Sequence, residues 1–122
     1  MSEIFNLNVC EISSLIQNKE LKAEAVLSSY LENIKKHNGD INAIVSQVSS
    51  DQLLEQANKI DNMDFKEIKT KPLLGIPIAI KDLEDTKGIR TTYGSKIFEQ
   101  NIDGRRAIDV EGSSLSCACK NS

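Results

Sequence analysis

The chain has 122 residues, which is enough for one small domain with a core of its own. Apolar residues make up 39% and charged residues 27%, and the net charge of −3 argues against a nucleic-acid or anionic-membrane partner. Aromatic residues are only 4% and tryptophan is absent, so aromatic platforms for stacking nucleic-acid bases are not expected.

The N-terminal stretch and the cysteines indicate a cytoplasmic protein. MSEIFNLNVCEISS has neither the basic start nor the apolar stretch of a signal peptide, and no segment is apolar for long enough to span a bilayer. The three cysteines, Cys10, Cys117 and Cys119, are an odd number, which argues against a disulfide framework. The pair Cys117 and Cys119 has only the distant His37 as a further ligand, so we expect free thiols, no metal site and no cofactor.

Helical periodicity predicts two helices in the first third of the chain. The first covers residues 9–16, with Asn8 and Glu11 at the spacing of a capping box, and should end in the polar residues 17–19. The second should end at Asn38-Gly39, where glycine would adopt the left-handed conformation of a helix cap. Its apolar stripe consists of Val26, Leu27, Tyr30, Leu31 and Ile34.

The next elements alternate between strand and helix. Residues 41–48 alternate and are rich in β-branched side chains, which predicts a strand, and a helix should follow from Ser49 to about Asn62. A charged linker over residues 64–71 leads to a second strand over residues 74–81. A helix between two strands indicates an α/β layer arrangement, although two strands are few for a complete sheet.

The second strand ends on a lysine, and this lysine is the main candidate for chemistry. Alternation places Ile76, Ile78 and Ile80 on one face of the strand and Ala79 with Lys81 on the other. If the strand is buried, desolvation would lower the pKa of Lys81 and allow it to act as a general base at the strand end, where α/β sheets usually bind ligands. The alternative is a lysine that simply reaches water.

Glycines lie on both sides of the second strand, and the loop after Lys81 is acidic. Gly75 before the strand and Gly88 and Gly94 after it would let the backbone approach a substrate closely. The acidic residues from Asp82 to Asp85 are interpreted as a solvated loop, and residues 91–95 as a turn in which no neighbour activates Ser95 as a nucleophile.

The segment PLLGIPIAIKDLEDTKGIRTTYGS resembles the N-terminal part of the amidase signature family, which includes bacterial amidases and the A subunit of glutamyl-tRNA amidotransferase. The resemblance covers about residues 5–100. It rests on a pattern in fixed register that matches Pro72, Leu73, Gly75, Ile76, Pro77, Ile78, Ala79, Ile80, Lys81, Asp82, Asp85, Thr86, Gly88, Thr91, Thr92, Gly94 and Ser95.

The resemblance implies an α/β/α layered fold, of which this chain would hold the N-terminal helices and first strands, and hydrolysis of amide C–N bonds by a Ser–cis-Ser–Lys triad. Lys81 stands at the position of the catalytic lysine. The alternative function is a non-catalytic remnant or a module that docks onto a partner. An incomplete sheet also implies oligomers through exposed strand edges.

The last part of the chain departs from the family pattern. Residues 101–122 have no helical stripe, so we expect a disordered tail outside the family domain, with at most a short strand around residues 106–110. Both family serines belong to a Gly/Ser-rich signature further along. Gly112-Ser113-Ser114 resembles a piece of it, but lies too close to Lys81 and has the wrong neighbours. We therefore expect a chain that ends before both serines and is inactive alone.

Overall fold

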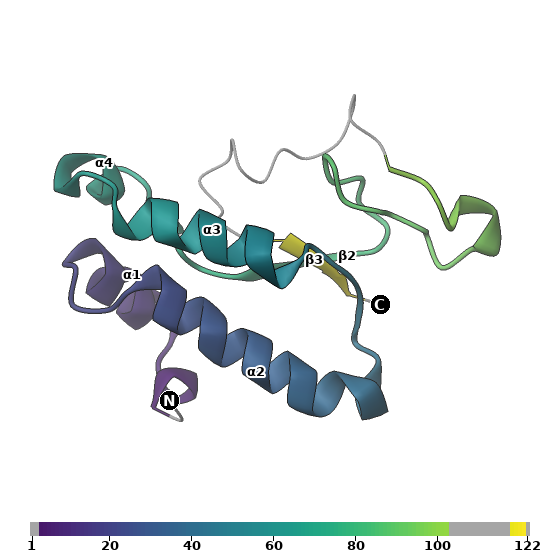
Figure 1. Cartoon of the computed structure of the whole chain (residues 1–122), viewed down its shortest axis with the longest axis horizontal. Helices are drawn as coiled ribbons and strands as arrows, with labels where there is room; N and C mark the ends of the chain where they lie inside the picture. The colour runs from purple at the N-terminus through teal and green to yellow at the C-terminus, as the bar shows by residue number, and fades with distance from the viewer. Residues whose placement is uncertain (1–2, 103–117, 122) are drawn as a thin grey trace.

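The structure is a computed structural model that describes residues 3–102 and 118–121. Helices form one half of it, and a long segment after the second strand extends away from them (Figure 1). The elements in chain order are η1 (Ile4–Asn6), α1 (Val9–Gln17), α2 (Ala23–Ile41), β1 (Ile44–Gln47), α3 (Ser50–Asp61), α4 (Phe65–Lys69), β2 (Ile78–Lys81), η2 (Lys96–Phe98) and β3 (Ala118–Asn121).

The three strands form one small mixed sheet in the order β1-β3-β2. β3 pairs antiparallel with β1 and parallel with β2, and Lys81 is the register partner of Asn121. The two predicted strands exist, but both begin later than predicted, at Ile44 and Ile78. The sequence did not predict β3. Residues 103–117, which include the strand expected around residues 106–110, lie outside the described residues.

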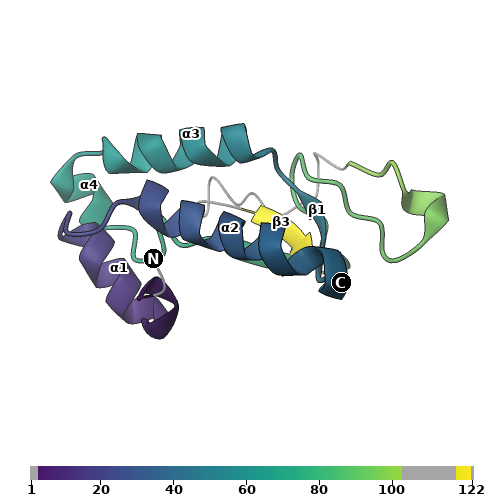
Figure 2. The same ribbon diagram turned by 60° about the horizontal axis from the view of Figure 1, so that its bottom comes forward.

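The hydrophobic core lies among the helices. α2 and α3 run side by side in roughly opposite directions and pack against each other (Figures 1 and 2). β1 and β2, by contrast, supply no fully buried side chain to this core. The core residues are Ile4, Ile12, Ile16, Ala23, Val26, Leu27, Leu53, Ala57, Ile60, Ile68 and Leu74.

Both predicted helix starts are confirmed. The Asn8 side chain accepts a hydrogen bond from the Glu11 amide at 3.0 Å, and the Glu11 carboxylate accepts one from the Asn8 amide at 2.7 Å, which completes the capping box. Ser49 caps α3 by accepting a bond from the Gln52 amide at 3.3 Å.

The predicted end of α2 at Asn38-Gly39 is wrong. The helix continues through Gly39 to Ile41, and Asn42 adopts the left-handed conformation with φ +51°. The Asn38 side chain holds the turn into β1, since it donates to the Ile44 carbonyl at 2.9 Å and accepts from the Ile44 amide at 2.8 Å. These two bonds replace a glycine cap. The charged linker also contains a short helix, α4, that buries Ile68.

A reciprocal contact connects the start of α2 to the end of α3. The Asp61 carboxylate accepts bonds from the Ala23 and Glu24 amides at 2.7 and 3.1 Å, which caps the N-terminus of α2. Lys19 donates to the carbonyls of Asp61 and Met63 at 3.1 and 2.6 Å. The two helices are therefore fixed to each other by side chains about forty residues apart in sequence, a separation that local motifs do not reveal.

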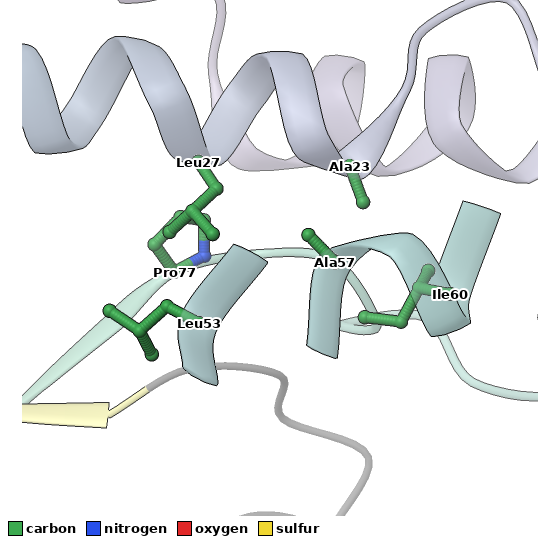
Figure 3. A pocket seen from close by; sticks show the side chains of 7 residues that line it. Ala23, Leu27, Leu53, Ala57, Ile60 and Pro77 are labelled. Carbon is green, nitrogen blue, oxygen red and sulfur yellow. The ribbon is translucent and has the colours of Figure 1, made fainter. Parts of the chain in front are cut away.

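The chain passes under the helices at Gly75 just before β2. Gly75 has φ +85°, and a Cβ added there would lie 2.9 Å from Ile16 Cδ1 and 3.2 Å from Ala23 Cβ. A small apolar pocket lies next to this crossing, between side chains of α2 and α3 and Pro77 (Figure 3). Gly75 therefore allows close approach of the backbone to the core, and the interpretation of its role as substrate approach is corrected.

Within residues 3–102 and 118–121, no helix is both long and apolar enough to cross a bilayer.

Candidate active site

Lys81 is the last residue of β2, directly before the chain turns into a long loop, residues 82–102. The strand alternates as predicted: Ile78 and Ile80 are half-buried, whereas Ala79 and Lys81 are exposed. Within the described part of the chain, the Lys81 ammonium has no hydrogen-bond or ion-pair partner. The position at a strand end is as predicted, but Lys81 lacks the burial on which the predicted desolvation depended.

The residue after Lys81 closes the first part of the loop. Asp82 is only 7% exposed, and its carboxylate accepts hydrogen bonds from the amide of Thr92, at 2.8 Å, and from the Thr92 hydroxyl. The Asp82 carbonyl also accepts a bond from the Tyr93 amide at 3.0 Å. These bonds bring residues 92–93 back to the end of β2, next to Lys81. The interpretation of Asp82 as part of a solvated acidic loop is wrong.

Thr91, the residue before Thr92, closes the second part of the loop. The Thr91 amide donates to the Asn101 carbonyl at 3.0 Å, and the Asn101 side chain donates to the Thr91 carbonyl at 3.0 Å. Thr91 and Thr86 are both 1% exposed, and both hydroxyls are within bonding distance of the Glu84 carbonyl, at 3.4 and 3.2 Å. The adjacent Thr91 and Thr92 thus close two successive loops.

Aromatic and small residues order the tip of the loop. The Tyr93 hydroxyl donates to the Asp85 carboxylate, and the Tyr93 ring meets Phe98 edge to face with centroids 5.2 Å apart. The predicted turn is confirmed, because the Ser95 amide donates to the Thr92 carbonyl at 2.9 Å and Gly94 has φ +70°. The Ser95 hydroxyl accepts from the Ile97 amide at 3.3 Å and so caps η2.

We predict that Asp82→Ala opens the loop beside Lys81. The change leaves the Thr92 amide and hydroxyl without their acceptor, and the loss of hydrogen bonds to a buried carboxylate should cost about 2–3 kcal/mol. Amide hydrogen exchange at Thr92 and Tyr93 should accelerate, whereas exchange in α2 should not change. Glu99→Ala, which removes an exposed acid from the same loop, is the control. Unchanged exchange at Thr92 in Asp82→Ala would contradict the role of the carboxylate.

Sequence reasoning missed three contacts that shape the site. Asp82 with Thr92 and Thr91 with Asn101 each join positions ten residues apart, and Arg90 donates to Ser46 of β1 at 3.2 Å. None of these spacings is a helical or strand period, so no local pattern indicated them. The described residues contain no cluster of three or more metal-ligating side chains. Cys10 is an exposed free thiol, while Cys117 and the Cys119 side chain lie outside the described part.

Comparison with known proteins reveals relatives that are several times longer. The chain is 40% identical over 109 residues to the A subunit of glutamyl-tRNA(Gln) amidotransferase from Caldanaerobacter subterraneus subsp. tengcongensis, an alignment that covers 89% of this chain and 22% of the relative. It is 40% identical over 100 residues to the corresponding protein of Koribacter versatilis, with coverage of 80% and 21%. The chain thus spans about a fifth of the length of these relatives.

A solved structure with the same local fold is also much longer than this chain. One chain of a solved structure, described as an unexpected vestigial protein complex that reveals the evolutionary origins of an s-triazine catabolic enzyme, aligns with a TM-score of 0.74 at 24% identity. The alignment covers 94% of this chain and 26% of that one. The helices and short strands therefore have the fold of the matching quarter of a larger protein.

The family comparison matches a longer range than the motif alone. The model of the Amidase family matches residues 25–112, which include most of α2, all of α3, Lys81 and the loop closed by the two threonines. The match extends beyond the family boundary expected near residue 100. From this match, and from the identity to the relatives above, the chain belongs to the amidase signature family.

Proposed function

We propose that this chain supplies the lysine base of an amide C–N hydrolase that works by a Ser–cis-Ser–Lys mechanism. The observation that carries the proposal is the position of Lys81, at the end of β2 and beside a loop whose closure depends on the adjacent Asp82. The family motif aligns Lys81 with the catalytic lysine. In this proposal the two serines come from parts of an amidase domain beyond the described residues.

The proposed chemistry balances without a cofactor. Neutral Lys81 takes a proton from the cis-serine, which takes one from the nucleophilic serine as that oxygen attacks the amide carbonyl. Backbone N–H groups stabilise the oxyanion, the lysine returns one proton through the cis-serine to the leaving nitrogen, and the C–N bond breaks to give an acyl-enzyme. Water then releases the acid, and in an amidotransferase the released ammonia passes to a second substrate. We place this activity in the cytoplasm, where aminoacyl-tRNA of the kind named for the relatives is used.

The exposure of Lys81 has a direct meaning under this proposal. Coulomb and desolvation effects on an ammonium are small in water and large in a dry site. Because Lys81 is exposed in the described structure, the base would be tuned only when further parts of an amidase domain cover the end of β2.

A chimera tests the proposal. Residues 1–102 of this chain would replace the matching part of the Caldanaerobacter relative, assembled with the other components of that enzyme. The chimera should catalyse the amidotransferase reaction, while the 122-residue chain alone should hydrolyse neither simple aliphatic nor aryl amides above the buffer rate. Turnover by the chain alone that disappears in Lys81→Ala would contradict the predicted inactivity, and a folded but inactive chimera would contradict the proposed function.

A second candidate function, a non-catalytic module that docks onto a partner, is favoured by apolar side chains at the end of the long loop. Ile97 is 88% exposed, Ile102 is 62% exposed and Phe98 is 45% exposed. A patch of this kind on a chain that spans a fifth of its relatives would fit the remainder of an amidase domain, or further copies of this chain. Binding to a relative that lacks its own matching segment, without recovery of activity, would support docking over catalysis.

A further inference from the structure

A second groove lies next to the candidate site and does not include Lys81. It lies between β1 and the second part of the long loop, and its volume of about 310 Å³ is at the lower end for small-molecule sites. Three of its lining residues are charged, two positively and one negatively. The lining residues are Val45, Arg90, Thr92, Gly94, Ser95, Lys96 and Glu99.

Arg90 is held in place by the strand across the groove. Its Nε donates a hydrogen bond to the Ser46 hydroxyl at 3.2 Å, which joins the loop to β1. A guanidinium carries further N–H donors in a fixed planar arrangement, and in the described part of the chain these have no other partner. The group is therefore oriented by one bond while the donors suited to a bidentate ligand remain available.

Two other polar side chains of the groove, Ser95 and Lys96, also keep donors available. Neither Lys96 nor Arg90 forms an ion pair with a described residue, although Glu99 lines the same groove. The Ser95 hydroxyl accepts a bond from the Ile97 amide, which leaves its proton free to donate. Thr92 contributes no such donor, because its hydroxyl already donates to Asp82. The available donors thus come from Arg90, Ser95 and Lys96, which line the same groove.

We propose that this groove binds a small oxyanion, a phosphate or a carboxylate group. Two cations and one carboxylate line the groove, so its net charge favours a negative ligand over a cation. A planar guanidinium fork matches two oxygens of either group, and an ammonium and a hydroxyl supply additional donors. Because Arg90 contacts β1 and Ser95 belongs to the part of the loop that Thr91 and Asn101 close, a bound anion would also connect β1 to that part of the loop.

Equilibrium dialysis of the 122-residue chain against labelled inorganic phosphate, and in parallel against labelled succinate, tests this proposal at constant ionic strength in chloride. We expect saturable binding of at least one anion at a single site per chain. Arg90→Gln and Lys96→Gln should each weaken it at least about tenfold, as expected when a charge-assisted hydrogen bond is lost. The anion that binds with the lower Kd shows whether the site prefers a tetrahedral phosphate or a planar carboxylate.

Lys66→Gln is the matched control, because it removes the same charge from an exposed position on α4, away from the groove. Its affinity should stay within about twofold of the unaltered chain. Lys96→Gln breaks no bond within the described protein, so a loss of binding in this variant does not reflect misfolding. Binding that does not saturate, or that is equally strong in all three variants, would overturn the proposal.

Discussion

Gly75→Ala is expected to lower the free energy of unfolding by about 3 kcal/mol, the largest stability effect we predict for a single methyl group. The residue has φ +85°, which strains any side chain, and the added Cβ would lie 2.9 Å from Ile16 Cδ1 and 3.2 Å from Ala23 Cβ. Both neighbours belong to the core between α1 and α2, so neither can move without disturbing helix packing. Thermal or denaturant unfolding measures the change.

Two other glycines serve as controls for this prediction. Gly88 has φ +74° with nothing within 4 Å of an added Cβ, so Gly88→Ala should show backbone strain alone, about 1 kcal/mol. Gly39 lies inside α2 with open space around it, and Gly39→Ala should stabilise the protein by about 0.5–1 kcal/mol. Equal destabilisation by Gly75→Ala and Gly88→Ala would show that the contact with Ile16 and Ala23 is unimportant.

Lys81→Ala in the chimera with the Caldanaerobacter relative is expected to lower kcat by roughly 10²–10⁴-fold, the range for loss of a positioned general base. Lys81→Arg should be similarly inactive, because a guanidinium stays protonated and cannot accept the proton of the cis-serine. Substrate KM should change little, since the proposed role is proton transfer rather than binding. Steady-state kinetics of the amidotransferase reaction check both variants.

Folding and charge need separate controls in this experiment. The melting temperature of each variant chimera is measured in parallel, so that a lower kcat is not mistaken for unfolding. Lys66→Ala, which removes an exposed lysine on α4, should retain full activity. An active Lys81→Ala chimera, with kcat within a few-fold of the parent, would exclude Lys81 as the base.

Local sequence patterns determined most of the helical half of this protein. The capping interactions at Asn8 and Ser49 are complete within four residues of chain, and the apolar stripe of α2 follows directly from the helical period. The alternation that placed Lys81 opposite the isoleucines of β2 is equally local. These features depend only on side chains that are neighbours in sequence.

The end of α2 and the strand β3 were not predicted correctly, and both depend on contacts outside the local pattern. Gly39 is compatible with a helix end, but the Asn38 side chain bonds to Ile44 and makes the end at Asn42 more favourable. β3 was not predicted because four residues contain too little pattern, and its place between β1 and β2 depends on the partners it finds. In the first case a contact six residues along the chain outweighed the local preference, and in the second the pairing partners are distant in sequence.

The motif around Lys81 identified the family, but only the tertiary structure decided what its residues do. Asp82 is buried because Thr92 returns to it, and Gly75 is required because α1 and α2 lie directly against its backbone. The exposure of Lys81 likewise depends on which parts of the fold cover the end of β2, and the strand sequence carries no information on that. Sequence thus determined α1, α3, most of α2, the strand alternation and the family, whereas burial and loop closure arose from contacts between distant segments.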